Sequence, residues 1–193
     1  MWYSLIVRML ALLFFISCAQ AAYFENPKAK ADSDKIVRQC SLPVFIASDQ
    51  NLTALRADMV GSAATHWNHS VGMDLFMDLG ILDWASREPN DAFILVSVEE
   101  TVEMKDKLCG ITRFGWDQKG CMHFVSIHVN PKCLKKGNEI FETIVRHELG
   151  HVLGLTHVDD FTKLMNHSIE ETLQHPVDVS QEEIERVKNL YMR

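Results

Sequence analysis

The sequence predicts a single α+β domain, and three observations support this prediction. Short β-branched runs bounded by turn residues alternate with longer stretches whose apolar residues recur at helical spacing. The 193 residues fit one domain, and neither an internal repeat nor an interdomain linker divides them. Hydrophobic residues make up 47% of the chain, and a chain of this length can bury a substantial core.

The first 21 residues are predicted to be a cleaved signal peptide. Arg8 precedes an apolar block at residues 9–16, which is far shorter than the roughly 20 residues that span a bilayer. Small residues follow, and Ala19-Gln20-Ala21 is typical of a signal peptidase site. We therefore expect a signal peptide at residues 1–21, a polar leader at 22–39 and the folded domain at 40–193.

Cys18 offers an alternative to simple cleavage. Phe15-Ile16-Ser17-Cys18 resembles a bacterial lipoprotein box, in which the cysteine is lipidated and becomes the new N-terminus. Both alternatives export the protein, so we expect it to be secreted, either extracellular or periplasmic. Contact with a membrane is expected only if Cys18 is lipidated.

The elements of the domain follow from the periodicity of apolar residues. Strand patterns predict four strands, at residues 42–47, 73–79, 92–98 and 123–129. Residues 108–117 are rich in turn residues and fit either a strand or a loop. Helical spacing predicts two long helices, at residues 52–67 and 139–153. Ser180 and Glu183 form a capping-box pattern that opens a third helix.

Charge and cysteine content limit the function and the compartment. The net charge of -7 argues against a nucleic-acid-binding protein. We also expect the protein to be a monomer. Without the signal peptide four cysteines remain, and an even number in an exported chain predicts two disulfides with three possible connectivities. We favour Cys109–Cys121, which would close a hairpin-like loop, and Cys40–Cys133 as the remaining pair.

The stretch RHELGHVLGLTH at residues 146–157 predicts a metal site. His147 and His151 are four residues apart on the predicted helix, so both imidazoles project from one face, one turn apart. Gly154 can end the helix in a left-handed conformation, after which His157 can approach as a third ligand. Three protein ligands and a fourth position open to water are typical of a catalytic zinc site.

Glu148 is the expected general base. It lies about 100° around the helix from His147, so it cannot easily be a ligand, but it can reach a water at the fourth position of the metal. It would take the proton of that water during attack on a polarised carbonyl. The alternative is a non-catalytic, zinc-dependent peptide-binding module of the same fold, and such a protein would be expected to lack this glutamate.

These residues match the H-E-x-x-H-x-x-G-x-x-H signature of the metzincins, in which a Met-turn follows the third histidine. Met165, eight residues after His157, stands where that turn is expected. Within the metzincins, the chain resembles the matrixins, the peptidase family of the matrix metalloproteinases. The segments that carry this resemblance are residues 109–112, 126–131, 157–165 and 180–191.

The resemblance implies a zincin-like catalytic domain with a twisted mixed sheet and three helices. It also implies an antiparallel edge strand, which we expect near residues 125–129, beside the metal helix. The implied activity is that of a secreted zinc-dependent metalloendopeptidase that hydrolyses peptide bonds of a protein or peptide substrate. An edge strand of this kind can bind an extended peptide by adding it to the sheet.

Several positions depart from the matrixin pattern. Val158 replaces the serine that usually follows the third histidine, which leaves another metzincin subgroup open, and Asn166-His167-Ser168 replaces the Pro-x-Tyr wall of the specificity pocket. Substrate preference therefore does not carry over. Arg38-Gln-Cys40 faintly resembles the cysteine switch of the propeptide, an alternative to a disulfide at Cys40.

The sequence supports one catalytic Zn2+ ion but no structural zinc or calcium. It contains no His-x-Asp loop of the kind that holds the structural zinc of matrixins and no convincing acidic-Gly loop for calcium. The other histidines are expected to be ordinary surface or core residues: His66, His69, His123 and His128.

Overall fold

The computed structural model describes residues 42–82, 93–104, 108–116, 122–136, 138–168 and 178–192. The predicted signal peptide, the leader, Cys40 and Cys121 lie outside these residues. None of the helices in the described part of the chain has the length and apolarity that a membrane crossing requires.

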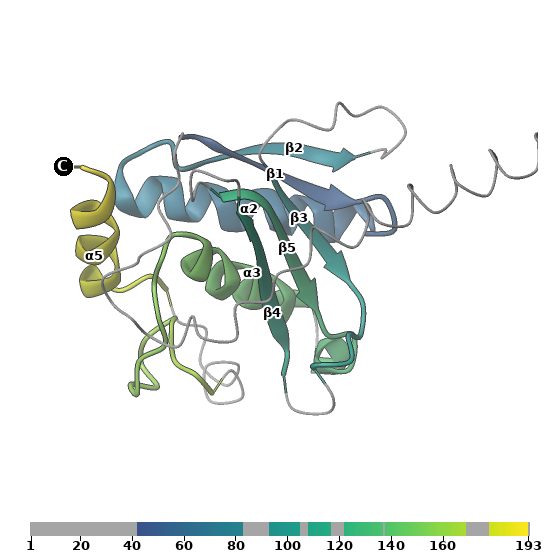
Figure 1. Ribbon diagram of the computed structural model, residues 1–193. Helices are drawn as coiled ribbons and strands as arrows, with labels where there is room; N and C mark the ends of the chain where they lie inside the picture. The colour runs from purple at the N-terminus through teal and green to yellow at the C-terminus, as the bar shows by residue number, and fades with distance from the viewer. Residues whose placement is uncertain are drawn as a thin grey trace, which may run out of the picture. The chain divides into compact units, whose positions relative to one another are not determined.

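The described residues form one five-stranded mixed sheet in the order β2-β1-β3-β5-β4 (Figure 1). β1 pairs in parallel with β2 and with β3, and β3 pairs in parallel with β5. β4 runs antiparallel to β5. The strands are β1 Val44–Asp49, β2 Phe76–Leu82, β3 Phe93–Val98, β4 Gly110–Trp116 and β5 Met122–Val129.

The prediction of an antiparallel edge strand is confirmed, but its position at residues 125–129 is wrong. β5 lies between β3 and β4, and β4 forms the edge. The alternation of β5 is misleading because Ser126 and His128 are also buried, on the face away from the helices. There the His128 ring lies 2.9 Å from the hydroxyls of both Ser126 and Ser97. Hydrogen bonding allows this burial at little cost.

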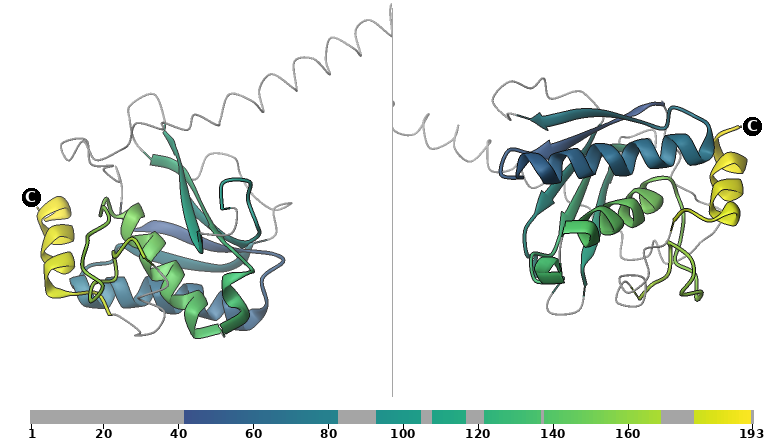
Figure 2. Two further views of the ribbon diagram at one scale, coloured as in Figure 1. Left: turned by 90° about the horizontal axis from the view of Figure 1, so that it is seen from below. Right: turned by 180° about the vertical axis from the view of Figure 1, so that it is seen from behind.

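Two long helices cover the same face of the sheet, as the two views of Figure 2 show. They are α2, Ala54–Val71, and α3, Asn138–Val152, and α5, Gln181–Tyr191, is the third predicted helix. Thr53 caps the start of α2, and Gly72 ends it with a φ of 74°. The helix-facing side chains of β1, β3 and β5 form one buried cluster with α2 and α3.

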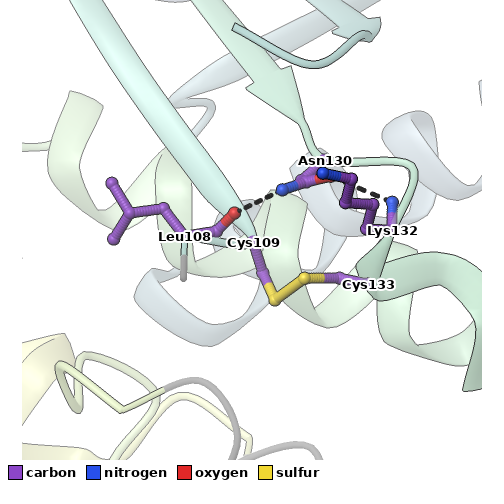
Figure 3. Close-up of a disulfide and its surroundings, with 5 residues drawn as sticks. All are labelled: Leu108, Cys109, Asn130, Lys132 and Cys133. Carbon is purple, nitrogen blue, oxygen red and sulfur yellow. Dashed lines mark hydrogen bonds between the residues drawn. A yellow bond between two sulfur atoms is a disulfide. The ribbon is translucent and has the colours of Figure 1, made fainter. Parts of the chain in front are cut away.

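One disulfide joins Cys109, just before β4, to Cys133, with 5.6 Å between their Cα atoms (Figure 3). The predicted pairs Cys109–Cys121 and Cys40–Cys133 are therefore both wrong. The register of the hairpin explains the correction, because Gly110 pairs with Val129 and places Cys109 beside the end of β5. Cys133 follows there, in the short 3-10 helix η2, Cys133–Lys136. In the sequence, Cys121 stands directly before Met122, the first residue of β5, whereas Cys133 follows the last residue of that strand.

Asn130 fixes the geometry between the two cysteines. Its main-chain N–H donates to the Cys109 carbonyl at 2.8 Å. Its side-chain amide donates to the Leu108 carbonyl at 2.9 Å, as Figure 3 shows. Its side-chain oxygen accepts from the Lys132 N–H at 2.9 Å, which turns the chain toward Cys133. Asn130 is buried, so these bonds satisfy its polar atoms.

Peptide mapping of the oxidised protein without reduction should therefore link Cys109 to Cys133. The bond closes a loop with a sequence separation of 24. The double variant Cys109→Ser/Cys133→Ser is expected to lose about 3 kcal/mol of unfolding free energy, through the greater entropy of its unfolded chain. Recovery of a Cys109–Cys121 peptide, or an unchanged denaturation midpoint in the double variant, would contradict this assignment.

Candidate metal centre

α3 and the turn that follows it bring three histidines together. His147 and His151 lie one turn apart on α3, with ring centroids 4.8 Å apart. The helix ends as the sequence predicts: Gly154 has a φ of 90°, and the Leu155 N–H donates to the Gly150 carbonyl at 2.9 Å. The chain then reverses and places the ring of His157 against the other two.

The free nitrogens of the three rings converge. His157 Nε2 lies 3.2 Å from Nε2 of His147 and 3.0 Å from Nε2 of His151. Four-coordinate zinc with bonds of about 2.0–2.1 Å separates its nitrogen ligands by about 3.3 Å. The observed spacing therefore fits a single zinc ion, and among the described residues these histidines form a group that could hold a metal.

Hydrogen bonds set the tautomers of two of the rings. His147 Nδ1 donates to the Leu164 carbonyl at 2.7 Å, and His151 Nδ1 donates to the Leu155 carbonyl at 2.9 Å. Because a carbonyl only accepts, each Nδ1 carries the proton and each Nε2 presents a lone pair. A hydrogen bond from the nitrogen that faces away from the metal orients an imidazole ligand in this way.

The environment also keeps the rings neutral. Burial lowers the pKa of His147 to about 4, and loss of hydration lowers the pKa of His157 to about 4. Burial lowers the pKa of His151 as well. At neutral pH all three rings are therefore unprotonated, as a metal ligand must be.

Glu148 lies on a different face of α3 and turns toward β4. Its side chain is buried, and the hydroxyl of Thr112 on β4 donates to its Oε2 at 2.5 Å. Burial raises the pKa of the Glu148 carboxyl, while His151 and the bond from Thr112 act in the opposite direction. The side chain of Glu148 is thus buried and held by a hydrogen bond from β4, one residue after His147 on α3.

Met165 packs beneath this part of α3. It is fully buried, and its side chain lies against Gly150, where a Cβ atom would collide with the sulfur. The Val158 N–H donates to the Met165 carbonyl at 2.9 Å, so the segment after His157 folds back on itself. The position of Met165 agrees with the Met-turn implied by the sequence.

Glu183 connects this turn to α5. Its Oε1 accepts from the Met165 N–H at 2.8 Å, and its Oε2 accepts from the N–H and hydroxyl of Ser180, each at 2.7 Å. The capping box is confirmed, but its second role was not visible from the sequence, because Met165 lies 18 residues away. Thr112 was missed for the same reason, since it is 36 residues from Glu148.

Of the four histidines that the sequence predicts to be ordinary surface or core residues, the three with described side chains lie outside the centre. His66 is half-buried on α2, with its Nε2 3.7 Å from an oxygen of Asp178. His69 is exposed on the same helix, and His128 is buried under the sheet. The side chain of His123 lies outside the described residues.

The lowered histidine pKa values predict how the stability of the metal-free protein depends on pH. Below about pH 6.5, His147 and His157 take up protons in the unfolded chain. In the folded chain they stay unprotonated down to about pH 4, because their pKa values are lowered to about 4. The unfolding free energy should therefore fall as the pH is lowered from about 6.5 to 4. Urea unfolding of chelator-treated protein measures this slope.

The variant His147→Gln is the comparison for that experiment, because His147 is the most deeply buried of the three rings. Burial also lowers the pKa of His66 and of His128. These two histidines contribute equally to the pH dependence of the unfolding free energy in the variant and in the wild type. The variant should therefore show a flatter pH dependence than the wild type. Identical slopes would contradict the assignment of a depressed pKa to His147.

Glu183→Gln is expected to destabilise the protein by about 1–3 kcal/mol, since an amide cannot accept from all three donors and leaves a buried group unsatisfied. Glu182→Gln is the matched control on the same helix, because its carboxylate is exposed and forms a surface ion pair with Lys163 at 3.1 Å. The control should unfold at the wild-type denaturant concentration. Equal midpoints for both variants would show that Glu183 does not hold the turn.

Comparison with solved structures supports this fold. Archaemetzincin from Methanopyrus kandleri aligns with 82% of this chain and 100% of its own, with a TM-score of 0.57 and 14% sequence identity, which shows a shared fold. A zinc-dependent peptidase from Methanocorpusculum labreanum (strain Z) aligns with 75% of this chain and 99% of its own, with a TM-score of 0.45 and 12% identity. No curated protein sequence matches the chain.

The family comparison covers most of the described domain. The sequence model of the matrixin peptidase family matches residues 47–192, which include the end of β1, all the other strands, α3 with its histidines, and α5. Zinc is the metal expected for this family, and the three converging histidines are compatible with it. The chain therefore belongs to the matrixin family and is a zinc metallopeptidase with a zincin-like fold.

Proposed function

We propose that this protein is an exported zinc-dependent endopeptidase with a single catalytic zinc ion. The ligands are His147, His151 and His157, and Glu148 is the general base. One observation carries the proposal: three neutral imidazoles present their Nε2 atoms to a common point, and a buried carboxylate lies next to them on the same helix. A structural zinc site would be expected to supply a fourth protein ligand instead.

Zinc bound by these three residues would supply Lewis-acid chemistry, which polarises a peptide carbonyl and activates water. Glu148 takes a proton from the attacking water and later delivers it to the amine of the leaving peptide. Its raised pKa suits both steps, because a base that must also act as an acid works best with a pKa near the working pH. The Nδ1 bonds of His147 and His151 hold the two rings in place throughout.

β4 is the proposed binding site for the substrate main chain. It pairs with β5 on one side, and no strand among the described residues pairs with its other side. An extended peptide can add to such an edge. The strand has seven residues, about 20 Å, which is enough to hold substrate on both sides of the bond that is cleaved. This length favours an endopeptidase over an enzyme that trims chain ends.

The proposed export rests on the N-terminal sequence and on the disulfide. Residues 1–21 have the pattern of a signal peptide, and Cys109–Cys133 is a bond typical of oxidising compartments. Lipidation of Cys18 is the alternative form of export. We propose a monomer that acts on protein or peptide substrates.

A digest of a diverse peptide library tests the proposal. The zinc-loaded protein should cleave internal bonds, and a chelator should abolish cleavage until zinc is restored. Glu148→Gln should lower the rate by at least about 10²–10⁴-fold with the metal still bound, because it removes the base without removing a ligand. Glu182→Gln, an exposed change of the same chemistry, is the control and should remain fully active.

Two results would contradict parts of this proposal. Full zinc occupancy in both His147→Ala and His157→Ala would reject the ligand set. A wild-type protein that holds zinc and retains peptides without cleaving any of them would instead indicate a non-catalytic peptide-binding module.

A further inference from the structure

The edge strand β4 contacts the carboxylate of Glu148 at two points. Thr112 donates its hydroxyl hydrogen to Oε2 at 2.5 Å. Gly110, two residues earlier on the same face of the strand, lies against the other oxygen, Oε1. β4 therefore restricts the positions of both carboxylate oxygens of the proposed general base.

Gly110 is close to Glu148 because it has no side chain. A Cβ atom at this position would collide with Oε1 and would lie 2.8 Å from Cγ2 of Ile144, which is closer than such atoms approach. Ile144 and Glu148 are one turn apart on the face of α3 that packs on β4. The small residue thus leaves room for a carboxylate in a tightly packed contact.

Thr112 provides the polar part of the same contact. The carboxylate of Glu148 is buried, and a buried charged group needs a hydrogen-bond partner to keep one orientation. The main-chain oxygen of Glu148 is the other acceptor near the hydroxyl, at 3.5 Å, which is too long to compete with the bond to Oε2. The hydroxyl is therefore committed to the carboxylate.

We propose that Thr112 is a positioning residue for Glu148, and that Gly110 keeps open the space in which the carboxylate is held. This inference rests on the proposed function, because it explains how the general base of that reaction is oriented. A freely rotating glutamate could turn away from the attacking water, whereas the hydroxyl holds Oε2 and leaves the carboxylate in one rotamer. The strand that is proposed to bind the substrate then also orients the base.

Three variants test this role by steady-state kinetics with a peptide substrate. Thr112→Val keeps the shape and removes the hydroxyl, so kcat should fall about ten- to a hundredfold, with KM within twofold of the wild type and zinc content unchanged. Thr112→Ser keeps the hydroxyl and should restore most of the lost rate. Gly110→Ala should lower kcat in the same way, because its methyl group displaces the carboxylate.

Thr65→Val is the matched control, since Thr65 is exposed on α2. It makes the same exchange of hydroxyl for methyl away from Glu148 and should leave kcat unchanged. The inference is overturned if Thr112→Val keeps wild-type kcat, or if Thr112→Ser is as slow as Thr112→Val, since packing alone would then explain the loss.

A double-mutant cycle in urea unfolding separates this inference from the proposed function, because it needs no activity. Thr112→Val and Glu148→Gln, alone and combined, should shift the unfolding midpoint in a non-additive way if the two side chains interact. Additive shifts contradict the inference even if the wild type is an active peptidase. A wild type that cleaves nothing contradicts the proposed function and, with it, the positioning role, even where the cycle shows coupling.

Discussion

The burial of α3 is the constraint on which the rest of the structure depends. Its residues Phe141, Ile144, Leu149 and Val152 are all buried, so the helix cannot rotate without exposing a large apolar surface. The indole N–H of Trp67 on α2 donates to the Arg146 carbonyl at 2.9 Å and fixes the helix along its axis. Once the rotation and translation of α3 are set, its remaining faces present the histidines to one side and Glu148 to another.

The buried polar groups of the site, His147 and Glu148, are tolerated in this packed environment because each has a hydrogen-bond partner. Two imidazoles donate to main-chain carbonyls, and the glutamate accepts from Thr112. Nε2 of His157 lies 3.2 Å from that of His147 and 3.0 Å from that of His151, an arrangement that a cation between them would stabilise. The burial that lowers the pKa of His147 is thus the same physical cause that makes its ring available as a ligand at neutral pH.

The parts of the site that come from different elements are joined by local links. Cys109 lies directly before β4, and Cys133 lies in η2, which leads into α3, so the disulfide ties the strand of Thr112 to the approach of the helix of Glu148. Glu183 ties the start of α5 to Met165, and Met165 packs on Gly150 of α3. Both the strand that carries Thr112 and the turn that carries Met165 are therefore attached to α3.

The sequence by itself determined the features that depend on local geometry. The four-residue spacing of His147 and His151, the left-handed Gly154 and the capping box at Ser180 were predictable because helical periodicity and capping involve residues within one or two turns. The matrixin resemblance supplied the antiparallel edge strand but not its identity. Only the tertiary structure decided that β4 is the edge, that Cys109 pairs with Cys133, and that Thr112 meets Glu148. These contacts join residues 24 to 36 positions apart, and they depend on strand order and register, which the packing of the whole sheet against α2 and α3 sets.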